Sequence, residues 1–548
     1  MTPDIAYSSL LPLLVVLGAA IVSVLVEAFA PARHRYAVQM VLYLGGLVAA
    51  LVTVVMLAGT RLVTAGGAVA VDGPSLFLQG ATVIVAIGAG LLIGERSRAG
   101  VSAGAAVGAS TGVAGASAGA AAQARRPVLA GFAPQAALAP GGDAEREAER
   151  ADVSQTEVFP LALFATGGLM LFPAANDLIT LFIALEVLSL PLYVMCGIAR
   201  RRRLLSQEAA VKYFLLGSFS SAIFAYGAAL IYGYAGTVEF GGIAAVVAAE
   251  GSSSLILIGM AMMSVGLLFK VGAVPFHTWT PDVYQGAPTS ITAFMAAGTK
   301  LAAFGAILRF FHTAVPRLEA DWAPVLWVIA ALTMIVGTVV AVTQNDVKRL
   351  LAYSSVAHAG FLLTGVLGPP AAGTSAVLFY LAAYAVSTVG VFAVAGLVRD
   401  PDGAEITDLQ AWAGLGRRQP LVAGAFALLL LALAGIPLTS GFIAKFAVFS
   451  AAVAGGAVTL VVIGVLTSAI AASFYVRVIV IMFFRDDGAG VSGADGSGLG
   501  GPGTSEVAFA RRPVTLAVVA VTVVVTLALG IAPQPLLDLS EAAAGFAR

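Results

Sequence analysis

Apolar runs dominate the pattern of residues along this chain. Many of them extend for about twenty residues with almost no charge, which is the length that crosses a bilayer as an α-helix. Short polar turns separate the runs, as expected where each helix must satisfy its own backbone polar groups. We predict an all-α polytopic membrane protein with about fourteen transmembrane helices, which begin near residues 8, 37, 76, 158, 177, 207, 253, 287, 323, 347, 373, 420, 457 and 513.

Two polar stretches interrupt this pattern. Residues 97–157 are rich in Ala and Gly and end in the charged run from Asp143 to Asp152, whereas residues 486–512 are rich in Gly and Ser. Such compositions bury too little apolar surface to order themselves, so we predict a disordered insert and a flexible loop, both cytoplasmic. The other predicted parts are three N-terminal helices, two five-helix repeats, and a last helix with a short tail, at residues 1–96, 158–312, 323–485 and 513–548.

Composition supports the membrane interpretation. Hydrophobic residues make up 59% of the chain and charged residues 11%, whereas soluble domains carry roughly a quarter charged residues. The single cysteine, Cys196, excludes intrachain disulfides, cysteine-rich zinc sites and cysteine-held iron–sulfur clusters within this chain. Gly498, Gly500 and Gly503 have the spacing of a dinucleotide-binding loop, but no strand precedes them. We therefore expect no cofactor, metal or nucleic acid on this chain.

Loop arginines predict the orientation in the membrane. If the N-terminus lies outside the cytoplasm, the loops on that outer side hold few basic residues beyond Arg61 and Arg317. The cytoplasmic loops then hold most of the basic residues, namely Arg33, Arg35, Arg125, Arg126, Arg200 to Arg203, Lys348, Arg349, Arg417, Arg418, Arg511 and Arg512. This bias follows the positive-inside rule and predicts a multi-pass protein of the cell inner (plasma) membrane with both termini outside the cytoplasm.

A weak internal duplication is also visible. The pair Asn176 and Asp177 precedes the fifth span as Asn345 and Asp346 precede the tenth. Prolines interrupt the seventh and twelfth spans at corresponding positions, Pro275 and Pro437. A repeat of five helices turns the second copy upside down, and inverted repeats with broken helices are typical of transporters whose ion path lies near the bilayer midplane.

Lysine is rare and unusually placed in this chain. Of the 29 Lys and Arg residues, five are lysines. One of these is in a basic loop, and the other four lie in or against apolar spans: Lys212, Lys270, Lys300 and Lys445. Arginine stays protonated, whereas a desolvated lysine can release and regain a proton. Intramembrane lysines therefore indicate proton transfer.

One carboxylate, Glu186, falls near the middle of a span. At a separation of about 7 Å and an effective dielectric near 20, Glu186 and Lys270 would interact by about 2.4 kcal/mol, which is enough to switch a proton. The structural alternative is that the lysines form ion pairs or extend to the interface, and for Lys212 the two interpretations carry equal weight. His277 and His358 could carry protons between lysines or simply pack in the interior.

Two stretches of sequence carry a family resemblance. One runs from Asn176 through Glu186 to Tyr193. The other comprises Lys270, Val274, Pro275, Phe276, His277, Trp279, Pro281, Asp282, Tyr284 and Pro288. These stretches resemble the antiporter-like subunits of the proton-pumping NADH-quinone oxidoreductase, respiratory complex I. A lysine rather than a glutamate at Lys445, and an end soon after the last span, favour the subunit N branch over subunits M and L.

The resemblance implies a fourteen-helix fold with two inverted five-helix repeats, broken helices 7 and 12, and a polar axis that joins two half-channels. Carried over by position, the relay residues are Glu186, Lys270, Lys300 and Lys445, with Lys212 and His358 at further matching positions. NADH, FMN, the iron–sulfur clusters and quinone would then belong to partner subunits, and the neighbours would be other antiporter-like and small membrane subunits.

The expected activity is proton translocation as one subunit of an NADH:quinone oxidoreductase. The alternative is a subunit of an Mrp-type cation/proton antiporter, which shares the fold. A third interpretation is a structural membrane subunit whose polar axis only supports assembly.

Overall fold

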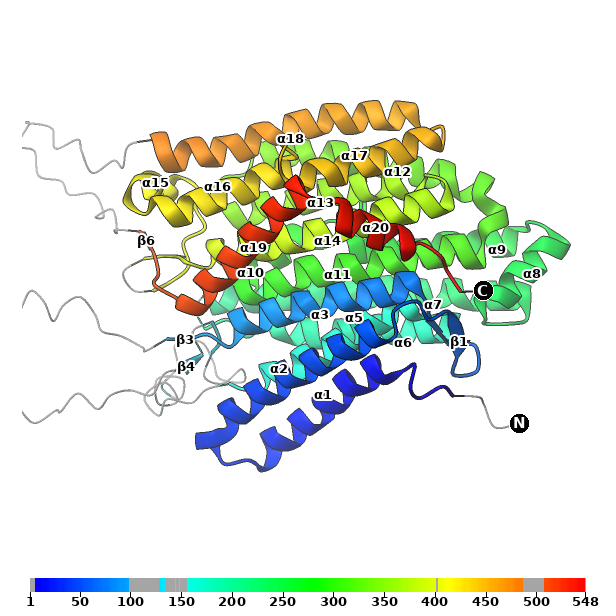
Figure 1. The fold of residues 1–548 in the computed structure, drawn as a ribbon, viewed down its shortest axis with the longest axis horizontal. Coiled ribbons are helices and arrows are strands. Elements are labelled where there is room, and N and C mark those ends of the chain that lie inside the picture. The colour runs from blue at the N-terminus through cyan, green and yellow to red at the C-terminus, as the bar shows by residue number, and fades with distance from the viewer. Residues whose placement is uncertain are drawn as a thin grey trace, which may run out of the picture.

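The structure is a computed structural model of the chain. It describes residues 5–97, 128–129, 131–133, 143, 147, 155–200, 202–400, 403–485 and 507–547. The described part is almost entirely helical (Figure 1), as the apolar runs predict. Most of the insert predicted at 97–157 and most of the loop predicted at 486–512 lie outside the described residues.

Long helices succeed one another along the chain. In order they are α1 (Leu11–Phe29), α2 (Ala32–Met56), α3 (Gly73–Ile93), α5 (Val158–Leu171), α6 (Leu178–Cys196), α7 (Arg203–Ala235), α9 (Ser254–Val271), α11 (Thr289–Arg309), α12 (Glu319–Val342), α13 (Val347–Val366), α14 (Pro370–Ala395), α16 (Pro420–Ala434), α17 (Ser440–Ala454), α18 (Val458–Phe484) and α19 (Pro513–Ile531). Shorter helices are α8 (Phe240–Glu250), α10 (Trp279–Gly286), α15 (Leu415–Arg418), α20 (Gln534–Ala542), the single turns η2 (Phe172–Ala174), η4 (Pro316–Leu318) and η5 (Gln410–Trp412), and the π-helical turn η3 (Phe310–Ala314).

Eleven or twelve of the fourteen predicted spans correspond to helices that are long and apolar enough to cross a bilayer, and shorter or less apolar helices stand at the other predicted positions. Among the described residues, eleven helices are long and apolar enough to cross a bilayer, or twelve if the α15 and α16 segments, bent by 118°, count as one span. The eleven leave out the short helix α5, the helix α13, and the two halves α16 and α17. Counting α5, α13 and the α16–α17 pair as one span each brings the eleven to fourteen.

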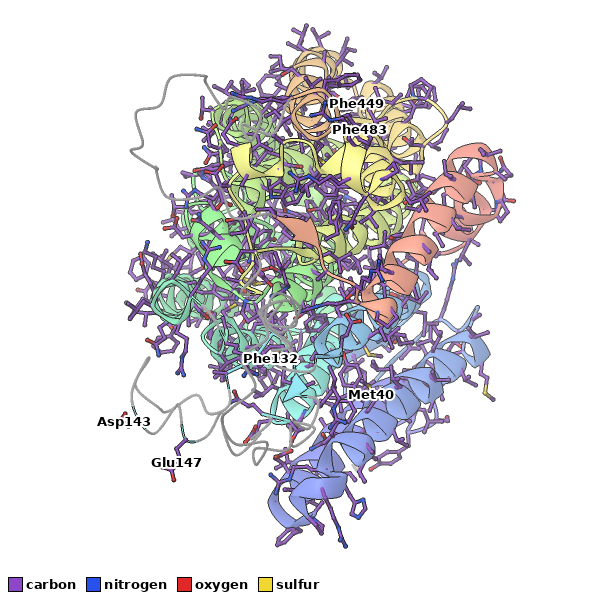
Figure 2. All side chains as sticks on the ribbon, turned by 90° about the vertical axis from the view of Figure 1, so that its left-hand side faces the viewer. Met40, Phe132, Asp143, Glu147, Phe449 and Phe483 are labelled. Carbon is purple, nitrogen blue, oxygen red and sulfur yellow. The ribbon has the colours of Figure 1, made fainter. Side chains whose placement is uncertain are left out.

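Both chain ends described by the structure lie on the same side of the bundle (Figure 1). The opposite side, where α7, α11, α13 and α19 begin, carries the Arg-rich turns and is called the basic end below. Seen from the basic end, the bundle is elongated: Met40 on α2 lies toward one end of it, and Phe449 on α17 and Phe483 on α18 lie toward the other (Figure 2).

Burial separates an inner axis from the lipid-facing helices. All of the most apolar stretch of α11 is buried, and 89% of that of α14, against 28% for α1 and α19. Large apolar side chains such as Val52, Phe219 and Val465 are instead exposed on α2, α7 and α18. Because lipid can solvate such side chains, their exposure is the pattern of a bundle that sits in a bilayer. The two inner helices provide a protein-lined interior in which polar groups can be held.

Three short antiparallel ribbons close the ends of the bundle. They are β1 (Leu62–Thr64) with β2 (Val69–Val71), β3 (Arg96–Ser97) with β4 (Val128–Leu129), and β5 (Val398–Arg399) with β6 (Ala508–Phe509). Phe132, visible on the basic end in Figure 2, forms a bridge with Ala199. Val128, Leu129 and Phe132 lie within the insert predicted at 97–157, and their pairing with the bundle shows that the prediction of disorder is wrong for this part of it.

The duplicated Asn-Asp pairs have the same local structure. Asp177 and Asp346 each accept the backbone N–H of the residue three further on, and thereby cap α6 and α13. Each also forms an antiparallel bridge with a loop residue, Glu239 for the first and Asp408 for the second. Aspartate is a preferred capping residue because its oxygen satisfies an N–H that has no partner in the helix. These matching turns support the predicted duplication.

Candidate functional site

Lys270 lies at the end of α9 with its amine in the interior. The side chain is buried, and Nζ donates to the Ser189 hydroxyl on α6 at 2.7 Å and lies 3.4 Å from the Tyr193 hydroxyl. The rings of Tyr193 and Tyr213 lie 5.4 and 5.6 Å from the same nitrogen. Hydroxyls and aromatic faces can hold an ammonium without neutralising it, so the charge stays available for transfer.

Glu186 is one turn away from that hydroxyl contact on α6. It interacts electrostatically with Lys270, but no direct ion pair joins the two among the described residues. Its Oε1 is buried and has no hydrogen-bond partner in the described part of the chain. A carboxylate with unused acceptor capacity beside a lysine held by a hydroxyl is an arrangement in which a proton can change partners.

The first predicted break holds the next lysine. Helix α9 ends at Val271, Gly272 follows with a φ of +72° that suits glycine, and α10 begins only at Trp279. The interruption leaves the Val271 carbonyl without a helical partner, and Lys300 on α11 donates to it at 2.7 Å. A buried carbonyl at a helix end needs a donor, and a cation there is favoured by the helix dipole.

The second break has the same arrangement of a lysine and a freed helix carbonyl. Helix α16 ends at Ala434, Gly435 follows with φ +83°, and α17 begins at Ser440. Lys445 on α17 donates to the Ala434 carbonyl at 2.7 Å and to the Ser468 hydroxyl on α18 at 2.8 Å. In both halves of the protein, therefore, a buried lysine binds the last carbonyl of an interrupted helix.

His358 lies on α13 and interacts electrostatically with both Lys300 and Lys445. Its Nδ1 is 2.7 Å from the Tyr380 hydroxyl, and its Nε2 is 3.4 Å from the Tyr475 hydroxyl. A cavity of about 10 Å³ beside the ring gives room for about one water molecule. With a hydroxyl at each ring nitrogen, the imidazole can receive a proton on one side and release it on the other.

The remaining predicted residues are less deeply placed. His277 lies half-buried in the first break, with its ring 6.3 Å from that of Tyr353. Lys212 is 42% exposed and forms ion pairs of 2.7 Å with Glu208 and with Asp282 on α10. These ion pairs are what the structural interpretation of Lys212 predicts. A role in proton transfer stays a prediction for both Lys212 and His277.

Sequence reasoning missed several groups of the site. Lys348 was assigned to a basic loop, yet it lies in the first turn of α13, is 1% exposed and donates to the Ala287 carbonyl at 2.7 Å. Lys348 is one of only five lysines in a chain whose other basic residues are arginines, and this rarity could have indicated that it belongs to the site. The hydroxyls of Ser189, Tyr380 and Tyr475 were not singled out, because a hydroxyl in an apolar run gives no pattern of its own.

Buried lysines held by the end carbonyls of interrupted helices define a membrane protein of the antiporter-like type. The comparisons with known proteins agree with this class. A sequence model of the family described as NADH:quinone oxidoreductase/Mrp antiporter matches residues 175–471, which include every lysine of the site. The chain is also 60% identical to NADH-quinone oxidoreductase subunit N of Rhodococcus opacus, over 100% of this chain and 97% of that protein.

Solved structures show the same fold. A chain of respiratory complex I from Thermus thermophilus with bound aureothin is 30% identical, with a TM-score of 0.72 over 97% of this chain and 99% of that chain. A chain of the Mrp complex from Dietzia is 24% identical, with a TM-score of 0.74 over 98% and 97%, so its likeness shows the fold alone. The chain belongs to the NADH:quinone oxidoreductase/Mrp antiporter family, and within it to the subunit N group.

Proposed function

We propose that this chain is the membrane-arm subunit N of an NADH-quinone oxidoreductase, and that it moves protons outward across the cell membrane. The observation that carries the proposal is the set of buried amines, Lys270, Lys300 and Lys445, which are each 5% exposed or less and bind hydroxyls or freed carbonyls. Charges are expensive in a bilayer and are retained where they move ions or protons.

The relay runs through groups of this chain alone. Glu186 modulates the proton affinity of Lys270, and Lys300 and His358 lead toward Lys445. Oxidation of NADH and reduction of quinone take place in other subunits, which hold FMN and iron–sulfur clusters. Partners are thus other subunits of the complex, above all neighbouring antiporter-like and small membrane subunits. The chain takes part in a translocase without carrying a redox centre.

The membrane is the bacterial plasma membrane, with the basic end facing the cytoplasm and both termini outside it. Arginine-rich turns at one end of the bundle support this orientation. An Mrp-type antiporter subunit shares the fold, so fold alone does not separate the two functions. Co-purification with NADH-oxidising subunits decides between them.

Lys270→Ala tests the proposal directly. NADH-driven acidification of inverted membrane vesicles should fall by roughly tenfold, because the first amine of the path is lost. NADH oxidation with a water-soluble electron acceptor should stay at the wild-type level, and co-purification of this chain with the NADH-oxidising subunits shows that the complex is assembled. A variant that pumps at the full rate would refute the relay and leave a structural role for the lysine.

Gly435→Ala tests whether the second break positions Lys445. A Cβ at Gly435 would lie 2.9 Å from Lys445 Cδ, and the residue has positive φ. Gly456→Ala is the matched control, because Gly456 also has positive φ, +82°, but a Cβ there meets nothing within 4 Å. Both changes should cost about 1–2 kcal/mol of stability. Only Gly435→Ala should also lower pumping, by roughly threefold or more, since it displaces the amine. Equal pumping in the two variants would contradict this positioning.

A further inference from the structure

A buried carboxylate on the basic end is not part of the path described so far. Glu405 lies in the loop between β5 and η5, outside the membrane spans. The loop is held in place, because Ile406 N–H donates to the Val398 carbonyl and the Thr407 carbonyl accepts the N–H of Val347. Glu405 therefore has a fixed position over the starts of α11 and α13.

The contacts of Glu405 favour its ionised form. Its Oε1 forms an ion pair of 2.9 Å with Arg399, and its Oε2 accepts the hydroxyl of Thr289, the first residue of α11, at 2.6 Å. Burial raises the pKa of Glu405, but the charges of Arg399, Lys348 and Arg512 and the Thr289 hydroxyl together lower it further, so the pKa lies below its ordinary value.

Two small cavities meet at this carboxylate. Each has a volume of about 30 Å³, and both are lined by Glu405 and Arg399. Lys348 also lines the first, and Arg512 lines the second. The space suffices for about two water molecules in each, and charged walls favour filling it.

Lys348 faces Glu405 across the first cavity. The two interact electrostatically, yet they form no direct ion pair among the described residues. The Lys348 amine donates to the carbonyl of Ala287 at the end of α10. Lys348 is the second residue of α13. The same helix carries His358 ten residues later, about 15 Å farther into the bundle.

We propose that Glu405 takes up protons from water at the basic end and passes them through the first cavity to Lys348, at the start of a second path toward His358. Hydronium in the cavity gives its proton to the carboxylate and leaves water. The resulting carboxylic acid then protonates the neutral amine of Lys348 through a cavity water, which restores the carboxylate. The ammonium returns to the amine when its proton moves inward. This inference rests on the proposed proton translocation.

Glu405→Gln in the assembled complex is the test. Glutamine keeps the size of the side chain and can still accept from Thr289 and Arg399, but it cannot take up a proton. NADH-driven pumping is expected to fall to the level of Lys300→Ala. Glu95→Gln is the matched control, because Glu95 is also a buried glutamate at the basic end that accepts a threonine hydroxyl, from Thr515, but lines neither cavity. It should pump within about twofold of the wild type.

The outcomes separate this inference from the proposed function. If Glu405→Gln pumps like the wild type while Lys300→Ala does not, the uptake role of Glu405 is overturned alone. If Lys300→Ala also pumps fully, the proposed function fails first. If Glu405→Gln does not assemble, Glu405→Asp decides: it keeps the charge but withdraws the carboxylate from Thr289 by one methylene. Pumping lowered at least twofold supports the inference, and unchanged pumping overturns it.

Discussion

Replacing Lys300 by alanine is expected to lower NADH-driven proton pumping by roughly tenfold while the complex still assembles. Lys300 is 2% exposed, and its amine donates to the Val271 carbonyl at the end of the interrupted α9. It also interacts with His358, which in turn interacts with Lys445. Removing the amine thus interrupts the proton path at its centre, between the two halves of the protein. The measurement is the rate of vesicle acidification per NADH oxidised.

Lys300→Arg is the informative companion. Arginine keeps a positive charge that can bind the Val271 carbonyl, but its guanidinium does not release a proton under physiological conditions. A structural role would be preserved by this substitution, and a relay would not. We therefore expect Lys300→Arg to pump as poorly as Lys300→Ala. Wild-type pumping in the arginine variant would show that only the charge matters.

Arg309→Met is expected to destabilise the subunit by about 3–5 kcal/mol, because it leaves a buried aspartate without its cation. Both side chains of the Arg309–Asp72 ion pair are 0% exposed, and their atoms are 2.7 Å apart. Asp72 also caps α3 and accepts the N–H of Ala547 near the C-terminus. The midpoint of thermal inactivation of the purified complex, or its yield, reports the loss.

The double variant Asp72→Asn with Arg309→Met is the control for this prediction. It removes both charges, so it should be more stable than Arg309→Met alone; a double variant that is less stable would refute the explanation by an unpaired charge. Burial raises the pKa of Asp72, but Arg309 and two backbone N–H groups outweigh it, and the pKa lies below its ordinary value. The stabilisation is therefore complete above the ordinary aspartate pKa of about 3.9 and is lost as pH falls through the lowered value.

The lysine positions show what the sequence could and could not predict. Hydropathy placed Lys270, Lys300 and Lys445 inside spans, and the structure buries all three. It left Lys212 undecided, and the structure shows this lysine half-exposed and ion-paired. It failed for Lys348, which was assigned to a loop and is buried. At a span end, burial depends on which neighbouring segment covers the residue. For Lys348 these neighbours are the end of α10 and the loop of Glu405, which are distant in the sequence.

The two helix breaks were predictable, and their partners were not. Proline within an apolar run interrupts the helix by local sterics, so Pro275 and Pro437 placed both breaks correctly. Which donor binds each freed carbonyl depends on how the helices pack, and the sequence carries no local sign of it. The roles of Glu186, His277 and His358 likewise stay predictions until variants are measured.

The inner helix α11 is fastened at both ends. Thr289 at its start holds Glu405, and Arg309 at its end holds Asp72, about 30 Å away. These contacts at both ends oppose any shift of α11 along its own axis. Lys300 lies near the middle of α11. Its amine must therefore reach successive partners by rotation about the bonds of the lysine side chain, so that a proton can cross the centre of the bundle while the helices keep their positions.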